Sequence, residues 1–241
     1  STNCYDIEFS ANGHMFFYTL GATLVSVELT TDWDIGSANT STKYTTSALY
    51  SGSSAIMHFN IKPDGTKLWC MDYFTNGNQK NILEYTMTTP WDLSTRTLTA
   101  THTTPAKLFE GIRGNGSATG EEYTDHYYTR GIFEWNSDGT ALFVQRYNRE
   151  GQPHRSYLAK FGAKTAYDVS TLYVTGHMMA SIQGDSGVTS SWYFGPRSMM
   201  GGDGTMMIHA TTSSSPAYYY LCAQKTGGKS YLTGYHTAIT G

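Results

Sequence analysis

Little charge, few cysteines and no long apolar run characterise the sequence, and each shortage excludes a class of protein. Charged residues make up 15% of the 241 residues, against roughly 25% in an average soluble domain. No apolar run approaches the roughly 20 residues that a membrane-spanning helix needs. The 16 lysines and arginines form no cluster and the net charge is −3. We therefore expect neither nucleic acid nor a membrane surface as a partner, because both attract basic patches.

The three cysteines are too few and too widely spaced for a metal site or a disulfide framework. Cys4, Cys70 and Cys222 form no Cys-x-x-Cys pair, which argues against a zinc ligand set. Buried free thiols are the favoured interpretation. The chain begins at Ser1 without an apolar leader, which fits a product made in the cytoplasm at least as well as a trimmed secreted one.

What the sequence does contain favours strands and turns. It has 35 threonines, 23 serines, 19 tyrosines and 25 glycines. Threonine and aromatic residues favour strands, while glycine and serine favour turns. No window keeps apolar residues at the spacing of an amphipathic helix for three turns. The composition therefore predicts an all-β protein.

One short pattern occurs four times along the chain. Two residues with one residue between them, typically both apolar, begin the pattern, and a glycine stands four residues after the second of them. Two adjacent apolar residues begin three residues after the glycine. The copies contain Phe9 and Gly13, Ile61 and Gly65, and Trp135 and Gly139, and a fourth, weaker copy with Ser198 at its first position contains Met200 and Gly204. Three of the copies read Asp-Gly-Thr at the glycine. The pattern is typical of a hairpin whose turn needs a residue with positive φ.

A second motif follows three of the hairpins. An alternating apolar strand precedes an aromatic residue and an aspartate, at Trp33-Asp34, Trp91-Asp92 and Tyr167-Asp168. In such a unit the aspartate can cap nearby backbone N–H groups while its neighbours pack. A fourth strand is expected after each unit, for example around 172–175, and 218–223 is the expected third strand of the last copy.

The repeat length points to a β-propeller. The motif glycines are 52, 74 and 65 residues apart, which suits four strands per repeat with long loops. The repeats resemble the Asp-Gly-Thr and Trp-Asp-Leu-Ser-Thr blades of propellers in phage virion proteins and bacterial surface proteins. We predict one four-bladed propeller domain over residues 1–241, with a β-sandwich as the alternative. The expected blades cover 1–55, 56–110, 131–190 and 191–241, with an inserted loop at 111–130.

The same alignment predicts which side chains are buried between blades. Apolar positions of the hairpins and third strands should form the core. The residues expected there are Phe16, Val27, Leu68, Trp69, Tyr85, Leu142, Phe143 and Phe161.

Polar residues at one position of the first strands suggest a metal site. The alignment places Glu8, Asn60 and Glu134 there, with Met199 in the fourth copy. First strands lie nearest a propeller axis, and oxygen ligands suit Ca²⁺. Calcium-dependent lactonase-type propellers have a comparable constellation, so these three residues are candidate calcium ligands. The alternative is a polar lining of a wet channel, with no cofactor.

The inserted loop is the candidate binding surface. Its residues include Tyr123, Asp125, His126 and Tyr127, and long loops on a rigid scaffold often carry binding function. Tyrosines beside carboxylates suit a glycan or a protein contact. The alternative is a connector whose tyrosines pack on a neighbouring blade.

No motif specifies a reaction, so the sequence favours a non-enzymatic structural or binding propeller. The resemblance implies a phage or virus virion component, such as a tail, fibre or capsid-decorating protein, located in the virion or outside the cell. Its expected partners are other virion or surface proteins, further copies of the chain, or a glycan receptor. The alternatives are a secreted carbohydrate-binding propeller and a calcium-dependent lactonase-type hydrolase that uses Glu8 and Glu134.

Overall fold

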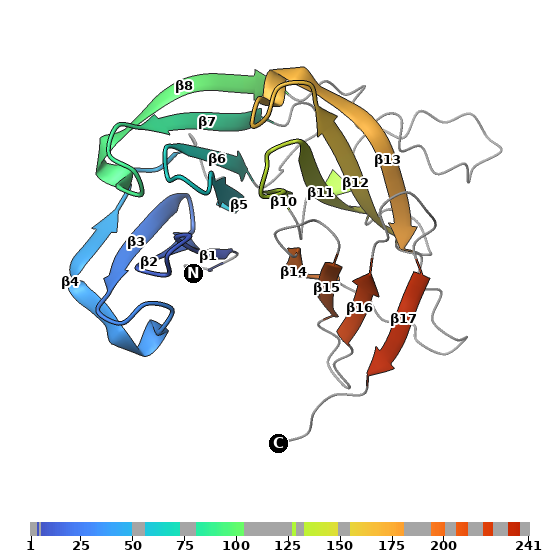
Figure 1. The fold of residues 1–241 in the computed structure, drawn as a ribbon, viewed down its shortest axis with the longest axis horizontal. Coiled ribbons are helices and arrows are strands. Elements are labelled where there is room, and N and C mark those ends of the chain that lie inside the picture. The colour runs from blue at the N-terminus through green and yellow to red at the C-terminus, as the bar shows by residue number, and fades with distance from the viewer. Residues whose placement is uncertain are drawn as a thin grey trace. The chain divides into compact units, whose positions relative to one another are not determined.

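The structure is a computed structural model, and it describes part of the chain. The described residues are 4, 6–49, 56–72, 81–103, 127–128, 133–148, 155–180, 194–200, 206–211, 219–223 and 231–236. Within them every extended segment belongs to an antiparallel sheet whose neighbouring strands are consecutive along the chain, apart from one short added strand. Figure 1 shows these sheets.

Four sheets follow one another, and we call them blades 1 to 4. Blade 1 contains β1 (Ile7–Phe9), β2 (Met15–Leu20), β3 (Thr23–Leu29) and β4 (Ala38–Thr45). Blade 2 contains β5 (Ile56–Ile61), β6 (Lys67–Asp72), β7 (Asn81–Met87) and β8 (Arg96–Thr103). Blade 3 contains β10 (Phe133–Trp135), β11 (Ala141–Asn148), β12 (Arg155–Ala163) and β13 (Leu172–Ala180), with β9 (Tyr127–Tyr128) also paired to β11. Blade 4 contains β14 (Phe194–Met200), β15 (Met206–Thr211), β16 (Tyr219–Ala223) and β17 (Tyr231–His236).

The chain divides into two compact units. The first contains Ser1–Thr75 and Gln79–Pro105, and the second contains Asn76–Asn78 and Ala106–Gly241. Blades 1 and 2 therefore belong to the first unit, and blades 3 and 4 to the second. Closure of the four blades into one ring stays a prediction.

The fold class is all-β and of the β-propeller type. Successive four-stranded antiparallel meanders of this length are propeller blades, and four such meanders follow one another along the described part of the chain. In the described part of the chain, no helix is long and apolar enough to cross a membrane.

The repeated glycines allow an aromatic ring to lie directly on the hairpin turn. Gly13, Gly65 and Gly139 have φ values of +75°, +74° and +71°, as the hairpin motif predicts. A Cβ atom on Gly65 would lie 2.5 Å from the ring of Trp91. The Gly65 carbonyl accepts a hydrogen bond from the backbone N–H of Trp91 at 3.0 Å. Gly13 makes the same two contacts with Trp33, and Gly139 makes them with Tyr167. The fourth glycine, Gly204, lies outside the described residues.

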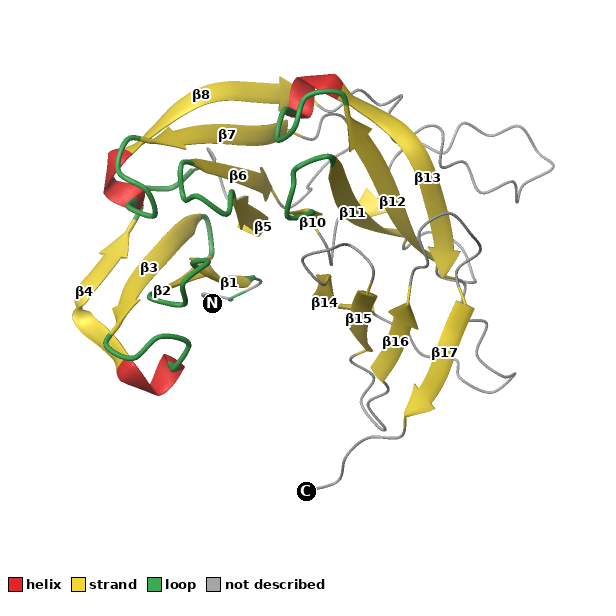
Figure 2. Ribbon diagram, viewed as in Figure 1, coloured by secondary structure: helices red, strands yellow, loops and turns green. Residues whose placement is uncertain are grey.

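The second motif is a single-turn 3-10 helix capped by its aspartate. The three turns, η1 (Ile35–Ser37), η2 (Leu93–Thr95) and η3 (Val169–Thr171), follow β3, β7 and β12 and are red in Figure 2. In η2 the Asp92 carboxylate accepts the Ser94 N–H at 2.9 Å. The capping role predicted for the aspartate is therefore confirmed in each of these three blades.

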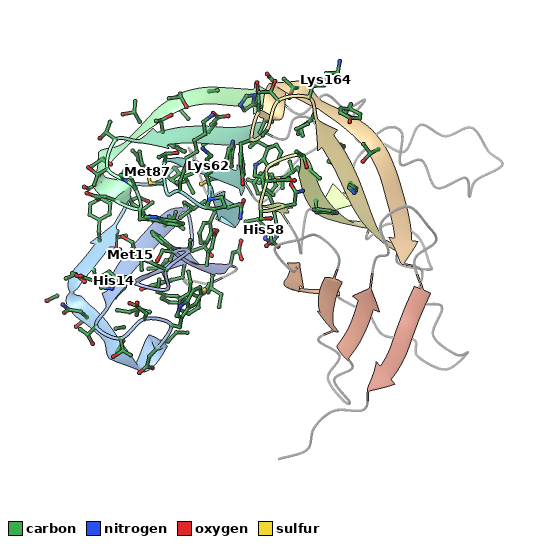
Figure 3. The ribbon with its side chains drawn as sticks, in the orientation of Figure 1. His14, Met15, His58, Lys62, Met87 and Lys164 are labelled. Atoms are coloured by element: carbon green, nitrogen blue, oxygen red, sulfur yellow. The ribbon has the colours of Figure 1, made fainter. Side chains whose placement is uncertain are left out.

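The main described core lies between blades 1 and 2. Phe17 and Leu24 of blade 1 belong to one buried apolar cluster with residues of β5, β6, β7 and η2 in blade 2. The labelled Met15 and Met87 in Figure 3 belong to opposite sides of this contact. The residues of blade 2 in this core are Phe59, Ile61, Leu68, Cys70, Leu83, Tyr85, Met87 and Leu93.

Two sequence-based expectations about burial need correction. Phe16 is only partly buried, although the other seven residues expected in the core are buried. Cys70 is buried, but Cys4 is exposed. Burial raises the pKa of the Cys70 thiol far above its usual range, which keeps that thiol protonated and unreactive. The side chain of Cys222 lies outside the described residues.

Candidate functional site

The predicted binding loop is described only at its end. Tyr123, Asp125 and His126 lie outside the described residues. Tyr127 belongs to β9, where its backbone pairs with Asn148 of β11. The loop therefore rejoins blade 3 as a short added strand, and the role of its side chains stays a prediction.

The candidate calcium ligand Glu8 has a structural task in the first unit. Its carboxylate accepts the backbone N–H of Ile61, with Oε1 and Oε2 at 3.2 and 3.1 Å. Asp6 accepts the N–H of Phe59 at 3.1 Å in the same way. Both N–H groups lie on the edge of β5 that is not paired with β6. Two carboxylates of blade 1 thus satisfy donors at the open inner edge of blade 2.

The remaining calcium ligands stay a prediction. Asn60 lies on β5 in the first unit, and Glu134 lies on β10 in the second. Among the residues that the structure describes, no group of three or more His, Cys, Asp or Glu side chains is arranged to hold a metal ion. The hydrogen bonds of Glu8 give the acidic residue at this position a structural role in the first unit.

A buried charged cluster lies on the opposite face of blade 2 from the blade 1 contact. Glu84 of β7 accepts hydrogen bonds from Lys67 Nζ at 2.6 Å, from Trp69 Nε1 at 3.2 Å and from His102 Nε2 at 2.9 Å. The side chains of Glu84 and His102 are 10% and 17% exposed. Strand pairing brings these groups together, because Glu84 lies directly opposite Trp69 in the sheet.

The hydrogen bonds of this cluster keep Glu84 ionised. Burial alone would raise the pKa of Glu84, but the hydrogen bonds from His102 and Lys67 outweigh it and lower the pKa to about 2. A carboxylate with three donors is a strong structural acceptor and a poor proton donor at neutral pH. The cluster therefore suits cohesion of blade 2 better than general acid catalysis.

A second imidazole is held at the surface of blade 1. His14, labelled in Figure 3, contacts Glu28 at 2.9 Å through Nε2 and Asp32 at 3.2 Å through Nδ1. The hydrogen bonds to Glu28 and Asp32 raise the pKa of His14. Both ring nitrogens can donate only in the imidazolium form. The bridge thus fastens the segment before Trp33 to the strands of blade 1.

One apolar face of blade 1 carries exposed side chains at its margin. We call it the front face, and it contains Ile7, Phe9, Phe16, Tyr18, Trp33 and Ile35. Val25 and Val27, which pair with Tyr18 and Phe16 on the same face, are buried. Four of the front-face residues are aromatic and contact one another, with centroids 5.3 Å apart for Phe9 and Phe16 and 5.4 Å apart for Phe9 and Trp33. Ile7, Trp33 and Ile35 are 53%, 58% and 50% exposed.

The positions of Ile7 and Ile35 are buried in the next two blades, whereas Trp91 and Tyr167, which correspond to Trp33, are only partly buried. Ile7 corresponds to Phe59 in blade 2, which is 2% exposed, and Ile35 corresponds to Leu93, which is 0% exposed. In blade 3 the corresponding residues Phe133 and Val169 are buried as well. Exposed apolar surface of this kind marks interaction sites. The front face of blade 1 is therefore the candidate functional site, as a contact surface.

Comparisons with known proteins add no function. No protein-family model and no curated protein matches the sequence. The periplasmic gluconolactonase of Pseudomonas aeruginosa superposes with a TM-score of 0.47 at 12% identity, over 99% of this chain and 58% of its own. A functionally unknown protein from Desulfotomaculum acetoxidans gives 0.45 at 8% identity, over 98% and 70%. The Swd1 β-propeller domain of Myceliophteria thermophila gives 0.35 at 10% identity, over 98% and 88%.

These similarities are too distant to support an argument about function. The chain spans 58% of the length of the gluconolactonase. Assignment to the β-propeller class follows from the four consecutive meander sheets and from the turn geometry shared by blades 1 to 3.

Two features of the site were missed in the sequence. Alternation along β6 and β7 could have placed Trp69 and Glu84 on one face. The apolar positions of the front face follow from the repeat alignment, which pairs Ile7 with Phe59 and Ile35 with Leu93.

Proposed function

We propose that the chain is a non-enzymatic structural or binding β-propeller, and that it serves as a component of a phage or virus virion. In this proposal it is a tail, fibre or capsid-decorating protein that contacts other proteins or a receptor. The single observation that carries the proposal is the front face of blade 1, where Ile7 and Ile35 are about half exposed although their counterparts in blades 2 and 3 are buried. The low charge and the resemblance of the repeat motifs to virion propellers support the choice of a virion.

Removing apolar groups from the front face should weaken assembly. The double variant Ile7→Ser/Ile35→Ser removes two side chains that are about half exposed, so the free protein should remain folded. Binding to purified virions, or assembly into defined multimers, should fall because the contact surface has lost apolar area. Sedimentation with particles measures this, and circular dichroism measures the fold.

Leu98→Ser is the matched control. Leu98 is 50% exposed but lies on β8 of blade 2, away from the front face. The control should assemble like the unmodified protein. Equal loss of assembly in both variants would reflect a general effect of added polar groups, and no loss in either would contradict the proposed contact.

The inserted loop is proposed as a second contact. Tyr123→Ala/Tyr127→Ala should weaken the same assembly while leaving thermal stability nearly unchanged, because pairing of β9 with β11 uses backbone groups. Unfolding of this double variant would assign the loop a structural role.

A carbohydrate-binding propeller is the second candidate, because the exposed ring of Trp33 suits stacking on a sugar. Glycan binding that is lost in Trp33→Ala would favour this candidate. A calcium-dependent lactonase-type hydrolase would instead show stabilisation by calcium and turnover of a lactone, both lost in Glu134→Gln.

A further inference from the structure

We propose that Arg96 binds a small oxyanion, a carboxylate or a phosphate, where blades 1 and 2 meet. The guanidinium reaches from β8 of blade 2 to Tyr44 of β4 and to Ser47 just after that strand. Tyr44 pairs with Ser26, which pairs with Phe17 in turn, so Tyr44 lies on the opposite face of blade 1 from the front face. The inference therefore does not depend on the proposed virion role.

The hydrogen bonds of Arg96 in the described part of the chain all go to neutral acceptors. Nη1 donates to the Leu93 carbonyl at 2.7 Å and to the Tyr44 hydroxyl at 3.2 Å, and Nη2 donates to the Ser47 hydroxyl at 3.3 Å. A guanidinium bonded to a carboxylate typically has shorter contacts, of roughly 2.7–2.9 Å. The two hydroxyl groups of blade 1 thus satisfy Arg96 only weakly.

The first unit supplies no carboxylate to neutralise this guanidinium. Within the described residues the ion pairs do not include Arg96, and the positions of the first unit outside them carry no aspartate or glutamate. Asp92, which precedes Arg96 by four residues, caps η2 through the Ser94 N–H. Asp72 is the last residue of β6 and lies at the end of blade 2 away from Arg96. Because a charge withdrawn from water needs a partner, the anion must come from outside the first unit.

The guanidinium has a pair of N–H groups suited to such an anion. Nε of Arg96 is buried and has no hydrogen-bond partner in the described part of the chain. Its N–H is parallel to one N–H of Nη2, and such a pair matches two oxygens of a carboxylate or a phosphate. Ser47 is exposed, so an oxyanion can replace its hydroxyl at Nη2 and thereby reach Nε as well.

The other repeats indicate that the turn before β8 does not require an arginine. Arg96 is the C-cap of η2, and the same position is Ala38 after η1 and Leu172 after η3. All three residues cap the 3-10 helix with their backbone N–H groups. The guanidinium is therefore an addition in blade 2, and its positive charge is not needed for its contacts with neutral acceptors.

Nuclear magnetic resonance of the Arg96 side chain tests the site in the full chain. The Nε–H signal is assigned by through-bond correlation with the Arg96 backbone and followed while inorganic phosphate or sodium acetate is added. Sodium chloride at the same ionic strength is the control for screening. We expect a saturable shift with phosphate or acetate and none with chloride. The anion with the stronger response identifies the class of ligand.

Two variants separate this site from a general effect of charge. Arg96→Gln keeps a side chain that can donate a hydrogen bond, but it removes the charge and the paired N–H groups. Lys43→Gln is the matched control, because it also removes one positive charge, from an exposed residue next to Tyr44. The rise in Tm caused by phosphate or acetate, relative to chloride, should persist in Lys43→Gln and be lost in Arg96→Gln.

Several outcomes would overturn the proposed oxyanion site. An Arg96 signal that moves equally with chloride would reflect screening alone. An unresponsive signal in the native chain would show that the guanidinium is already satisfied within the protein. Equal stabilisation of the native protein and Arg96→Gln by the anion would place the anion elsewhere. If Arg96→Gln does not fold, the titration of the native chain still decides, because it requires no variant.

Discussion

Replacing Gly65 by alanine should lower the free energy of unfolding by at least about 3 kcal/mol. A Cβ atom there would lie 2.5 Å from two atoms of the Trp91 ring. Moving the ring away would itself cost free energy, because the backbone N–H of Trp91 donates a hydrogen bond to the Gly65 carbonyl. The Trp91 side chain also packs against the core between blades 1 and 2. The positive φ of +74° adds to the cost. Denaturant unfolding monitored by circular dichroism measures the difference.

Gly21→Ala separates the backbone cost from the ring contact. Gly21 also has a positive φ, of +60°, but a Cβ atom added there would meet nothing within 4 Å. Its replacement should cost only about 1–2 kcal/mol. In a Trp91→Ala background the cost of Gly65→Ala should fall to the same range. Equal costs for Gly65→Ala and Gly21→Ala in the native background would show that the contact between glycine and ring contributes nothing.

Glu84→Gln should be the most destabilising conservative change among the charged residues of blade 2. The substitution keeps the size of the side chain but removes the charge that accepts hydrogen bonds from Lys67, Trp69 and His102. The pKa of Glu84 lies at about 2, against an ordinary value of 4.5. At about 1.4 kcal/mol per pKa unit, ionisation contributes up to about 3 kcal/mol of stability at neutral pH.

This contribution depends on pH in a defined direction. Because the pKa is lower in the folded protein than in the unfolded chain, the stabilisation is complete above pH 4.5 and is lost as the pH falls toward 2. The difference in unfolding free energy between the native protein and Glu84→Gln should therefore shrink over that interval. A difference that stays constant from about pH 7 to about pH 2.5 would contradict the assigned role.

Glu28→Gln is the control for the loss of a carboxylate. Glu28 also contacts a histidine, at 2.9 Å, but its side chain is 41% exposed. Exposed ion pairs contribute little, so the expected change is within about 1 kcal/mol.

The repeats allowed much of the local structure to be predicted. The positive φ of Gly65 and the capping by Asp92 follow from residue types at fixed spacing. The positive φ of Trp91, at 68°, does not. It arises because the ring turns back onto the glycine, a contact between residues far apart in the sequence that no local propensity reports.

Burial and the charged cluster required the packed structure. Alternation assigns Phe16 to an apolar face of blade 1, but it cannot say whether another sheet covers that face. His102 joins Glu84 across β7 and β8, whose register shifts between Glu84 and Tyr85. Such an irregularity moves side chains from one face to the other. Strict alternation therefore cannot place His102 reliably.

Hydroxyl-radical footprinting of the unmodified protein tests the central claim most directly. The open front face of blade 1 predicts that Trp33 and Ile35 are oxidised much faster than Trp91 and Leu93, their counterparts in blade 2. Each pair shares its local geometry, so a difference in rate reports only what covers the face. Equal protection of both pairs would contradict the claim that blade 1 presents a free contact surface.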